Sequence, residues 1–143
     1  QVGLCERFGT EAAMNLAVVA MGSNIDPETN IRKAREALFR GFMLKAESSF
    51  VWTRPIGLAD QDDFLNGAVL VETEQDLPDL RHTLKALETA LGRKKREEKF
   101  GPREIDLDVV VWNGQVVDKD FYERDFLQKS VREILPKIKM RCC

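Results

Sequence analysis

The chain has 143 residues, of which 43% are hydrophobic and 32% are charged. This length and composition are typical of one globular domain with its own core, and they exclude disordered and fibrous proteins. Basic residues number 22 and acidic residues 24, so the net charge is −2 and any affinity for phosphate must come from a local cluster of charges.

The two ends of the chain differ from its centre. Residues 1–13 lack the features of a secretory signal and are predicted to be an extension. We expect a single domain over 14–137 and a tail over 138–143. No apolar stretch is long enough to predict a membrane span. The cysteines show neither a disulfide framework nor a metal-binding spacing, which favours a cytoplasmic location; they are Cys5, Cys142 and Cys143.

The first half of the chain alternates between strand and helix patterns. Residues 16–21 (LAVVAM) form a short apolar run typical of a central strand. Asp26 followed by Pro27 predicts a helix start at which the Asp side chain caps free amides. That helix buries one face and ends near Gly41; the residues of the face are Ile31, Ala34, Leu38 and Phe42. Residues 45–53 (KAESSFVWT) predict one strand, because aromatic and β-branched residues are frequent there.

The second half begins with a loop over residues 54–63 and a strand over 64–73 (FLNGAVLVET). A helix is predicted from about Pro78 to Gly92, with an apolar stripe made by Leu80, Leu84, Leu87 and Leu91. A charged loop then leads to a strand over 105–112 (IDLDVVVW). Its continuation predicts a tight hairpin and a final helix; the residues concerned are Asn113, Gly114, Leu127, Val131 and Ile134.

The predicted order is β, α, β, β, α, β, β, α. Helices and strands are mixed, and one connection is a direct hairpin. This order predicts an α+β fold in which helices pack on a mostly antiparallel sheet, similar to a ferredoxin-like sandwich.

Asp106 and Asp108 are the sharpest chemical feature. On a strand, residues i and i+2 point to the same face, so two carboxylates stand side by side on an otherwise apolar strand. Such a pair is relieved by a divalent cation, and magnesium prefers carboxylate oxygens together with substrate phosphates. The alternative from the pattern alone is a half-exposed edge strand with alternating polar residues.

A basic loop lies just before the aspartates. Cationic side chains beside paired carboxylates are what a metal–polyphosphate site requires. The alternative is a solvated charged loop, since Glu97 and Glu98 lie within it. The run is also compatible with RNA binding, but no aromatic stacking motif accompanies it. Its basic residues are Arg93, Lys94, Lys95, Arg96, Lys99 and Arg103.

Phe64 and Asn66 could together bind a flat heterocycle, because a ring face and a planar amide are close in sequence. Taken alone, Asn66 is more often a hydrogen-bonding residue at a strand edge. His82, the single histidine, is predicted to point to solvent. No Gly-rich Walker loop is present, so a phosphoryl-transfer enzyme of this sequence is not of the P-loop class.

Four segments, in this order, carry a resemblance to a known family: AVVAMGSNI, SSFVWTRPIGLADQDDFLNGAVLVET, LETALGR and FGPREIDLDVVVW. From about Ala17 to Pro136 the chain resembles 6-hydroxymethyl-7,8-dihydropterin pyrophosphokinase of folate biosynthesis. The GPR-x-IDLD string is the most specific part. The resemblance implies transfer of pyrophosphate from ATP to the hydroxymethyl oxygen of the pterin, with AMP as the second product.

The resemblance also implies roles for individual residues. Asp106 and Asp108 match the aspartates that hold two magnesium ions, and with Arg93 and Arg103 they form the expected catalytic set. The loop between the two arginines would act as a lid over ATP. The positions that match pterin-binding residues are Thr53, Ile56, Phe64, Asn66 and Phe126. Those that match ATP-binding residues are Lys85, Glu88, Arg93, Phe100, Arg103, Val109 and Arg124.

The chain departs from the family pattern in three places. Lys85 stands where some relatives carry Gln, and Phe100 stands where a Trp often packs on the lid. After the Asn113-Gly114 hairpin, relatives commonly carry a longer segment with a Pro-His pair that touches ATP. Here Asp118 runs almost directly into residues 121–124. We therefore expect a short-form active enzyme, as a monomer or weak dimer.

Two other functions compete with this interpretation. The first is a catalytically weak module that binds a pterin or a nucleotide, suggested by the missing Pro-His segment. The second, less favoured, is a ferredoxin-like RNA-binding domain that uses the basic run. The leading interpretation expects small-molecule substrates, and neither a nucleic acid nor a membrane as partner.

Overall fold

The computed structural model describes residues 14–55, 60–96 and 101–138. In these residues the elements follow one another as β1 (Asn15–Ser23), α1 (Pro27–Gly41), β2 (Met43–Glu47), β3 (Val51–Thr53), β4 (Phe64–Thr73), α2 (Leu77–Ala90), β5 (Asp106–Trp112), β6 (Gln115–Val116), the 3-10 helix η2 (Lys119–Tyr122) and α3 (Asp125–Ile138).

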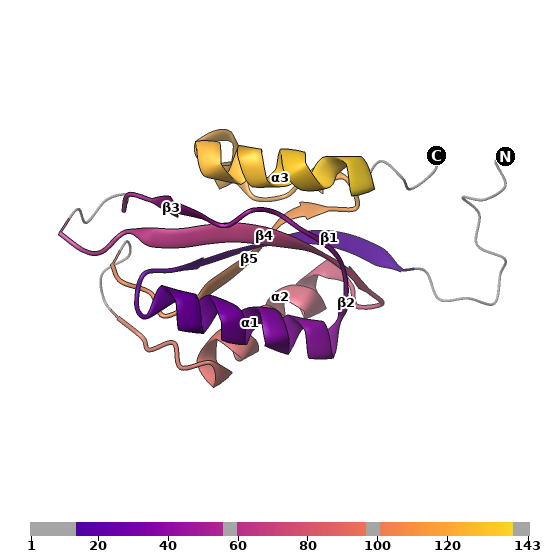
Figure 1. Cartoon of the computed structure of the whole chain (residues 1–143). Coiled ribbons are helices and arrows are strands. Elements are labelled where there is room, and N and C mark those ends of the chain that lie inside the picture. Colours follow the sequence, from indigo (N-terminus) through magenta and orange to yellow (C-terminus); the bar gives the residue numbers. More distant parts are fainter. Residues whose placement is uncertain (1–13, 56–59, 97–100, 139–143) are drawn as a thin grey trace, which may run out of the picture.

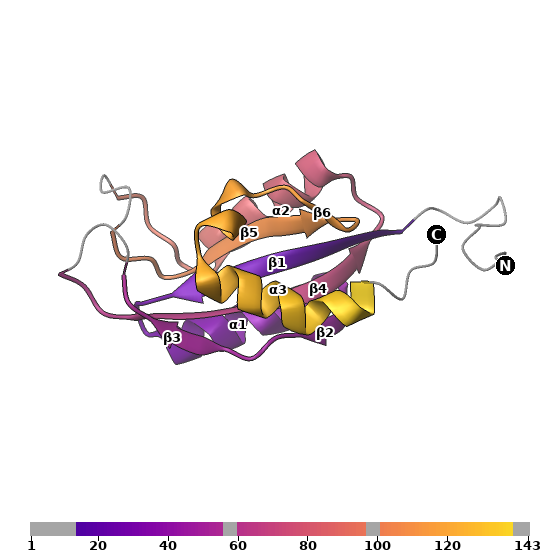
Figure 2. The ribbon, with the colours of Figure 1, turned by 90° about the horizontal axis from the view of Figure 1, so that it is seen from above.

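The strands form one antiparallel sheet in the order β2-β4-β1-β5-β6, and β3 also pairs with β4. Helices α1 and α2 cover one face of the sheet and α3 covers the other (Figure 1). Seen from above, α3 crosses the central strands β1 and β4 (Figure 2). The predicted α+β sandwich with a ferredoxin-like arrangement of helices and strands is confirmed.

Two apolar cores lie on the two faces, because successive strand residues point to opposite sides. On the α1–α2 face the core includes Met21, Leu65 and Leu107, together with Leu38 and Leu84 of the helices. The α3 face carries a smaller core, with Val18, Ala68, Leu70, Leu127, Val131 and Ile134. The smaller core leaves one end of the α3 face to polar residues, and the candidate site lies there.

The prediction of one strand over residues 45–53 was wrong. Strands β2 and β3 are separate, and both pair with β4. Between them Ser48 donates its N–H to Ala68 O, and its hydroxyl accepts the Ala68 N–H. Phe50 lies against Gly67, where a Cβ would be only 2.4 Å from the ring. The chain therefore bends to bring Phe50 over the glycine, and the element order gains one strand.

The capping role predicted for Asp26 was also wrong. Asp26 precedes α1 as expected, but its backbone is left-handed (φ 45°, ψ 53°) and its side chain makes no cap hydrogen bond. Its carbonyl accepts the N–H of Asn30, whose side chain in turn donates to Ile25 O. Aspartate tolerates this conformation better than most residues do.

The turn signals were read correctly. Asn113 and Gly114 both have positive φ, and they join β5 to β6 in the predicted hairpin. Gly92, with φ 104°, follows α2 as the predicted stop. The final helix is longer than expected, because α3 continues to Ile138, one residue into the segment predicted as a tail.

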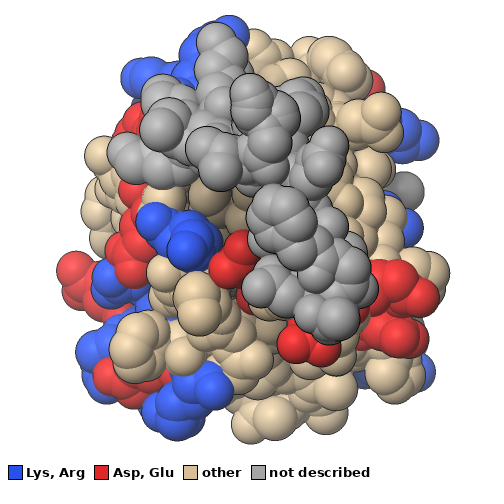
Figure 3. Space-filling model, turned by 90° about the vertical axis from the view of Figure 1, so that its right-hand side faces the viewer, with Lys and Arg blue, Asp and Glu red and all other residues tan. Residues whose placement is uncertain are grey.

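Figure 3 shows the end of the molecule at which β1 begins and α3 ends, remote from β3. Basic and acidic side chains are intermixed there, and the visible atoms form no large patch of one sign. His82 is exposed, as predicted. Among the described residues, no helix has the length and apolar character needed to cross a membrane.

Candidate active site

The paired aspartates of β5 lie on the face of the sheet that α3 covers. The antiparallel ladder places Asp106 opposite Gly22 and Asp108 opposite Ala20 of β1. Gly22 is in turn opposite Asn66 of β4. Directly opposed residues share a face, so Asp106, Gly22 and Asn66 form one row across three strands. The prediction that both carboxylates face the same side is confirmed.

A cleft of about 290 Å³ opens above this row. It gathers side chains from strands, loops and α3 that are far apart in the sequence. The predicted site residues that line it are Thr53, Phe64, Asn66, Arg103, Asp106, Asp108, Arg124 and Phe126. Ile56 and Phe100 lie outside the described residues. The described residues predicted to bind the pterin thus share one cavity with the two aspartates, Arg103 and Arg124. Four predicted ATP-site residues do not line it: Lys85, Glu88, Arg93 and Val109.

The floor of this cleft is neutral and closely packed. Asn66, only 9% exposed, donates from Nδ2 to Thr53 Oγ1 at 2.6 Å. Its Oδ1 lies directly above Gly22, where a Cβ would be only 2.6 Å away. Gly22 therefore makes room for the amide, and Thr53 fixes its orientation. Phe64 and Phe126 line the same cleft and are both half-buried.

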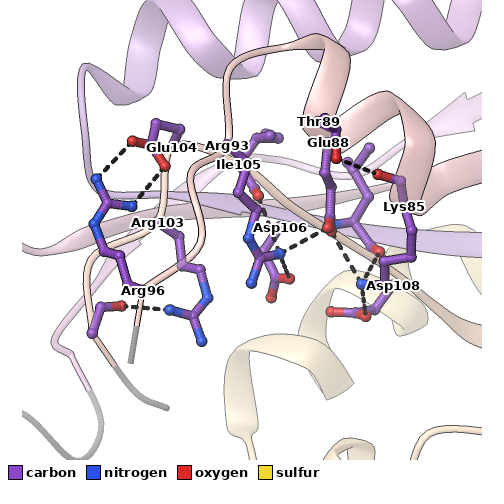
Figure 4. Close-up of polar contacts among 12 residues, drawn as sticks. Lys85, Glu88, Thr89, Arg93, Arg96, Arg103, Glu104, Ile105, Asp106 and Asp108 are labelled. Carbon is purple, nitrogen blue, oxygen red and sulfur yellow. Dashed lines mark hydrogen bonds and ion pairs between the residues drawn. The ribbon is translucent and has the colours of Figure 1, made fainter. Parts of the chain in front are cut away.

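One edge of the cleft is charged (Figure 4). Glu88 of α2 is buried, and its carboxylate accepts the N–H of Leu107 at 2.7 Å. Lys85 Nζ lies 3.1 Å from Glu88 Oε2 and 3.2 Å from Asp108 Oδ1. Arg93 Nη1 lies 2.8 Å from Glu88 Oε1 and 3.0 Å from Asp106 Oδ1. Each cation therefore bridges the buried glutamate and one aspartate.

These contacts shift the pKa of two groups. Burial and the neighbouring Asp106 carboxylate raise the pKa of Asp108 to about 7, although the Lys85 ammonium opposes the rise. Burial by itself would lower the pKa of Lys85, but the negative charges of Asp108, Glu88 and Asp106 outweigh it and raise the value. The carboxylate pair is thus held at a cost that a bound cation would reduce.

A second cleft, of about 460 Å³, adjoins the first one on the far side of Asp108. It lies between α2, β5 and the start of η2, and Asp108 and Asp118 line both clefts. Lys85 and Val109 contribute to its wall, with the Val109 side chain buried in the core so that mainly its backbone is available. Asp108 therefore stands where the two cavities meet, and its neighbour Asp106 lines the first cleft only.

Asn24 ties the loops around the first cleft together. Its Nδ2 donates to Gln61 Oε1 at 2.8 Å and to Asp62 O at 2.9 Å, in the loop before β4. Its Oδ1 accepts the Arg103 N–H at 2.8 Å, and its own N–H donates to Arg103 O. One buried amide therefore holds the loop that precedes Phe64 against the loop that precedes Asp106.

Two further ion pairs support the cleft wall. Arg96 donates to both carboxylate oxygens of Glu104, at 2.8 and 2.7 Å. These bonds and the N–H of Lys94 lower the pKa of Glu104 to about 2, against an opposing effect of burial. Arg124 Nη2, just before α3, lies 3.5 Å from Asp120 Oδ2 in η2.

Sequence reasoning missed several residues of the site. Gly22, Asn24, Asp118 and Asp120 were given no individual role. The position of the Gly-Ser-Asn turn at the end of the central strand was a usable signal, because that strand borders both β4 and β5. No sequence pattern marks Asp118 and Asp120 as site residues. Asp118 also caps the 3-10 helix η2, which is a common structural role for aspartate.

The donor set at the aspartates fits a hard divalent cation. Asp106 and Asp108 offer partly exposed carboxylates, with 40% and 42% of each side chain accessible. Among the described residues no group of three or more metal-ligating side chains is assembled. A magnesium ion held here would take its remaining ligands from phosphates and water, as magnesium commonly does.

Comparison with known sequences places the chain in a family. The sequence profile described as 7,8-dihydro-6-hydroxymethylpterin-pyrophosphokinase (HPPK) matches residues 18–136. A 2-amino-4-hydroxy-6-hydroxymethyldihydropteridine pyrophosphokinase of Bacillus subtilis is 34% identical, covering 87% of this chain and 80% of its own. The protein of that name in Methylorubrum extorquens is 38% identical, covering 87% and 85%, and that of Pseudomonas aeruginosa is 37% identical, covering 70% and 63%. The chain therefore belongs to the 7,8-dihydro-6-hydroxymethylpterin-pyrophosphokinase family.

Proposed function

We propose that this chain transfers the terminal pyrophosphoryl group of ATP to 6-hydroxymethyl-7,8-dihydropterin. The hydroxymethyl oxygen forms a bond to the β-phosphorus, and the bond from that phosphorus to the α–β bridging oxygen breaks. AMP leaves, and the hydroxyl proton goes to solvent. The observation that carries the proposal is the junction of two clefts at Asp108, beside Asp106, in a chain that belongs to this family.

The first cleft suits the pterin. A flat heterocycle can lie between Phe64 and Phe126, while the oriented amide of Asn66 reads its polar edge. Thr53 accepts one of the two N–H groups of Asn66 Nδ2 at 2.6 Å, so the amide keeps a second donor and its oxygen acceptor for the polar edge of the ring. In this proposal Ile56 contributes a backbone contact.

The second cleft suits the nucleoside part of ATP, with Lys85 and the backbone of Val109 in its wall. The triphosphate then crosses the aspartates toward the first cleft. Arg103 and Arg124 line that cleft, and Arg93 lies at its border, so all three can bind phosphate oxygens. Glu88 supports this region from below by holding Lys85 and Arg93. Phe100 is proposed to pack on the nucleotide.

Two magnesium ions are the proposed cofactors, held by Asp106 and Asp108. Bound there, they neutralise phosphate charge and polarise the phosphorus under attack. The residues of the chain position the two substrates, exclude water between Phe64 and Phe126, and hold the phosphates with guanidinium groups. No histidine base is needed, because the proton can leave the hydroxyl to water.

The test is AMP release with ATP, the hydroxymethyl-dihydropterin and magnesium. We expect turnover that needs all three components. The Asp108→Ala variant should lose roughly a thousandfold in turnover, since several kcal/mol of charge stabilisation disappear. It should fold normally, because it removes one of two repelling carboxylates. Glu36→Ala, on the exposed surface of α1, is the control and should keep the wild-type rate.

A pterin- or nucleotide-binding protein without turnover is the second candidate, favoured by the short connection between Asp118 and Arg124. Calorimetry would show ligand binding while the AMP assay stays at background. We also propose a cytoplasmic location and a monomeric or weakly dimeric state. The cysteine pattern supports the first, and sedimentation would test the second.

A further inference from the structure

Lys85 holds the position that a metal ion would need. Its Nζ lies 3.2 Å from Asp108 Oδ1, 3.1 Å from Glu88 Oε2 and 3.4 Å from Leu107 O (Figure 4). A divalent cation bound to the same carboxylate would lie about 2 Å from its oxygen. An ammonium group and a divalent cation that close would repel each other strongly in a partly desolvated site. Lys85 therefore competes with a divalent cation for Asp108.

Arg93 makes the matching contact on Asp106 but is held more firmly. Only 25% of its side chain is exposed, against 54% for Lys85. The Arg93 backbone is fixed as well, since its N–H donates to Glu88 O at the end of α2. Lysine carries a compact charge on a flexible four-carbon stem and changes partner more easily than a forked guanidinium. Lys85 is therefore the cation that can move.

Glu88 provides the pivot for this movement. Lys85 contacts its Oε2, whereas Arg93 contacts Oε1, so each cation keeps one anchor if it releases its aspartate. Lys85 also lines the second cleft, next to where the nucleotide is proposed to lie. If the Lys85 ammonium leaves Asp108, it can approach the phosphates while it keeps its contact with Glu88.

We propose that Lys85 is a displaceable counter-ion that blocks divalent cation binding in the free protein and transfers to the nucleotide phosphates when the metal–nucleotide complex enters. This rests on the proposed function for the identity of the incoming ligand. Its consequence is an order of binding. The metal arrives with the nucleotide, because only the phosphates offer Lys85 a new partner when it leaves Asp108.

The test measures Mn²⁺ binding to the free protein by electron paramagnetic resonance, with no substrate present. Lys85→Gln should bind Mn²⁺ at least about tenfold more tightly than the wild type, because the competing charge is gone. Lys85→Arg should stay as weak as the wild type, since it restores the charge. Arg81→Gln removes a cation from the same helix and the same cleft wall without touching Asp108, and should also bind weakly.

A second measurement follows the nucleotide. With a non-hydrolysable ATP analogue and Mn²⁺ together, Lys85→Gln should bind the analogue at least about fivefold more weakly, because one phosphate contact is lost. Two results would overturn the proposal: no gain in Mn²⁺ affinity in Lys85→Gln, or an equal gain in Arg81→Gln. These arms use no turnover. A failure of the proposed function would instead appear as absent AMP release in the wild type.

Discussion

The two halves of the site are built by different forces. The floor, made of Gly22, Asn66 and Thr53, is neutral and is fixed by sheet register and one short hydrogen bond. The edge, made of Lys85, Glu88, Arg93 and the two aspartates, is held by ion pairs that bridge α2 and β5. The contacts of the floor involve no charged side chain. At the edge, the contacts compete with the charges of any anionic ligand and its metal.

This difference separates recognition from chemistry. A planar, uncharged ring is best recognised by groups that are already oriented, because little entropy is then lost on binding. A polyphosphate with metal ions brings far more charge. The charged protein groups that bind it must therefore neutralise one another when no ligand is bound. Lys85 and Arg93 supply that balance, and Glu88 keeps them in reach.

The largest expected effect on stability comes from removing the ion pairs that Glu88 makes with Lys85 and Arg93. Glu88→Gln removes the one buried carboxylate that both cations contact, and leaves Lys85 and Arg93 facing only partly exposed aspartates. We expect a loss of about 3 kcal/mol in the free energy of unfolding, measured by urea denaturation. Glu36→Gln, which breaks an exposed 3.8 Å pair with Arg32, should change it by less than about 0.5 kcal/mol. Similar values for the two variants would mean that the buried cluster contributes little.

A smaller effect on stability is expected from disturbing the packing of Gly22 against Asn66 in the floor of the cleft. Gly22→Ala places a Cβ about 2.6 Å from Asn66 Oδ1, so the amide must move away from Thr53. We expect a cost of about 1–2 kcal/mol in stability and a loss of tenfold or more in pterin affinity, measured by calorimetry. The control is Gly41→Ala, where no atom lies within 4 Å of the new Cβ and helix propensity improves. Unchanged pterin affinity in Gly22→Ala would exclude Asn66 from the pterin site.

The floor and the edge also differ in how far the sequence predicts them. Strand β4 was predicted with its observed bounds, because an aromatic and β-branched run between polar segments is a strong strand signal. The i, i+2 spacing of Asp106 and Asp108 was enough to predict their common face. Nothing local shows that Gly22 lies between Asp106 and Asn66, since that depends on the pairing of three strands.

Long-range contacts set the limit of prediction. Asn24 reaches partners 37, 38 and 79 residues further along the chain, and none of them leaves a mark in the local pattern. The bend at Ser48–Phe50 was missed for the same reason, because its cause is Gly67 on a different strand. The roles of Lys85 and Glu88 came from family resemblance, and the structure adds the contacts that explain how they could act.

The smallest effect is expected at Glu104, on the loop that leads to the aspartates. Arg96 and the Lys94 N–H lower the pKa of Glu104 to about 2, so the ionised group stabilises the fold above its ordinary value of 4.5. That contribution is lost as the pH falls from 4.5 toward about 2, because the unfolded chain then takes up the proton first. Glu104→Gln should cost about 1 kcal/mol at neutral pH.

Urea denaturation from neutral pH down to about pH 3 distinguishes the charged loop at Glu104 from the neutral floor of the cleft. The deficit of Glu104→Gln should shrink across this range. The deficit of Gly22→Ala should stay constant, since neither Asn66 nor Thr53 titrates. A deficit for Glu104→Gln that does not depend on pH would show that the loop is held by packing. The positive charge of Arg96 would then contribute little to stability, and an uncharged donor could replace it. Arg93 would be the last arginine along the chain whose charge supports the aspartates.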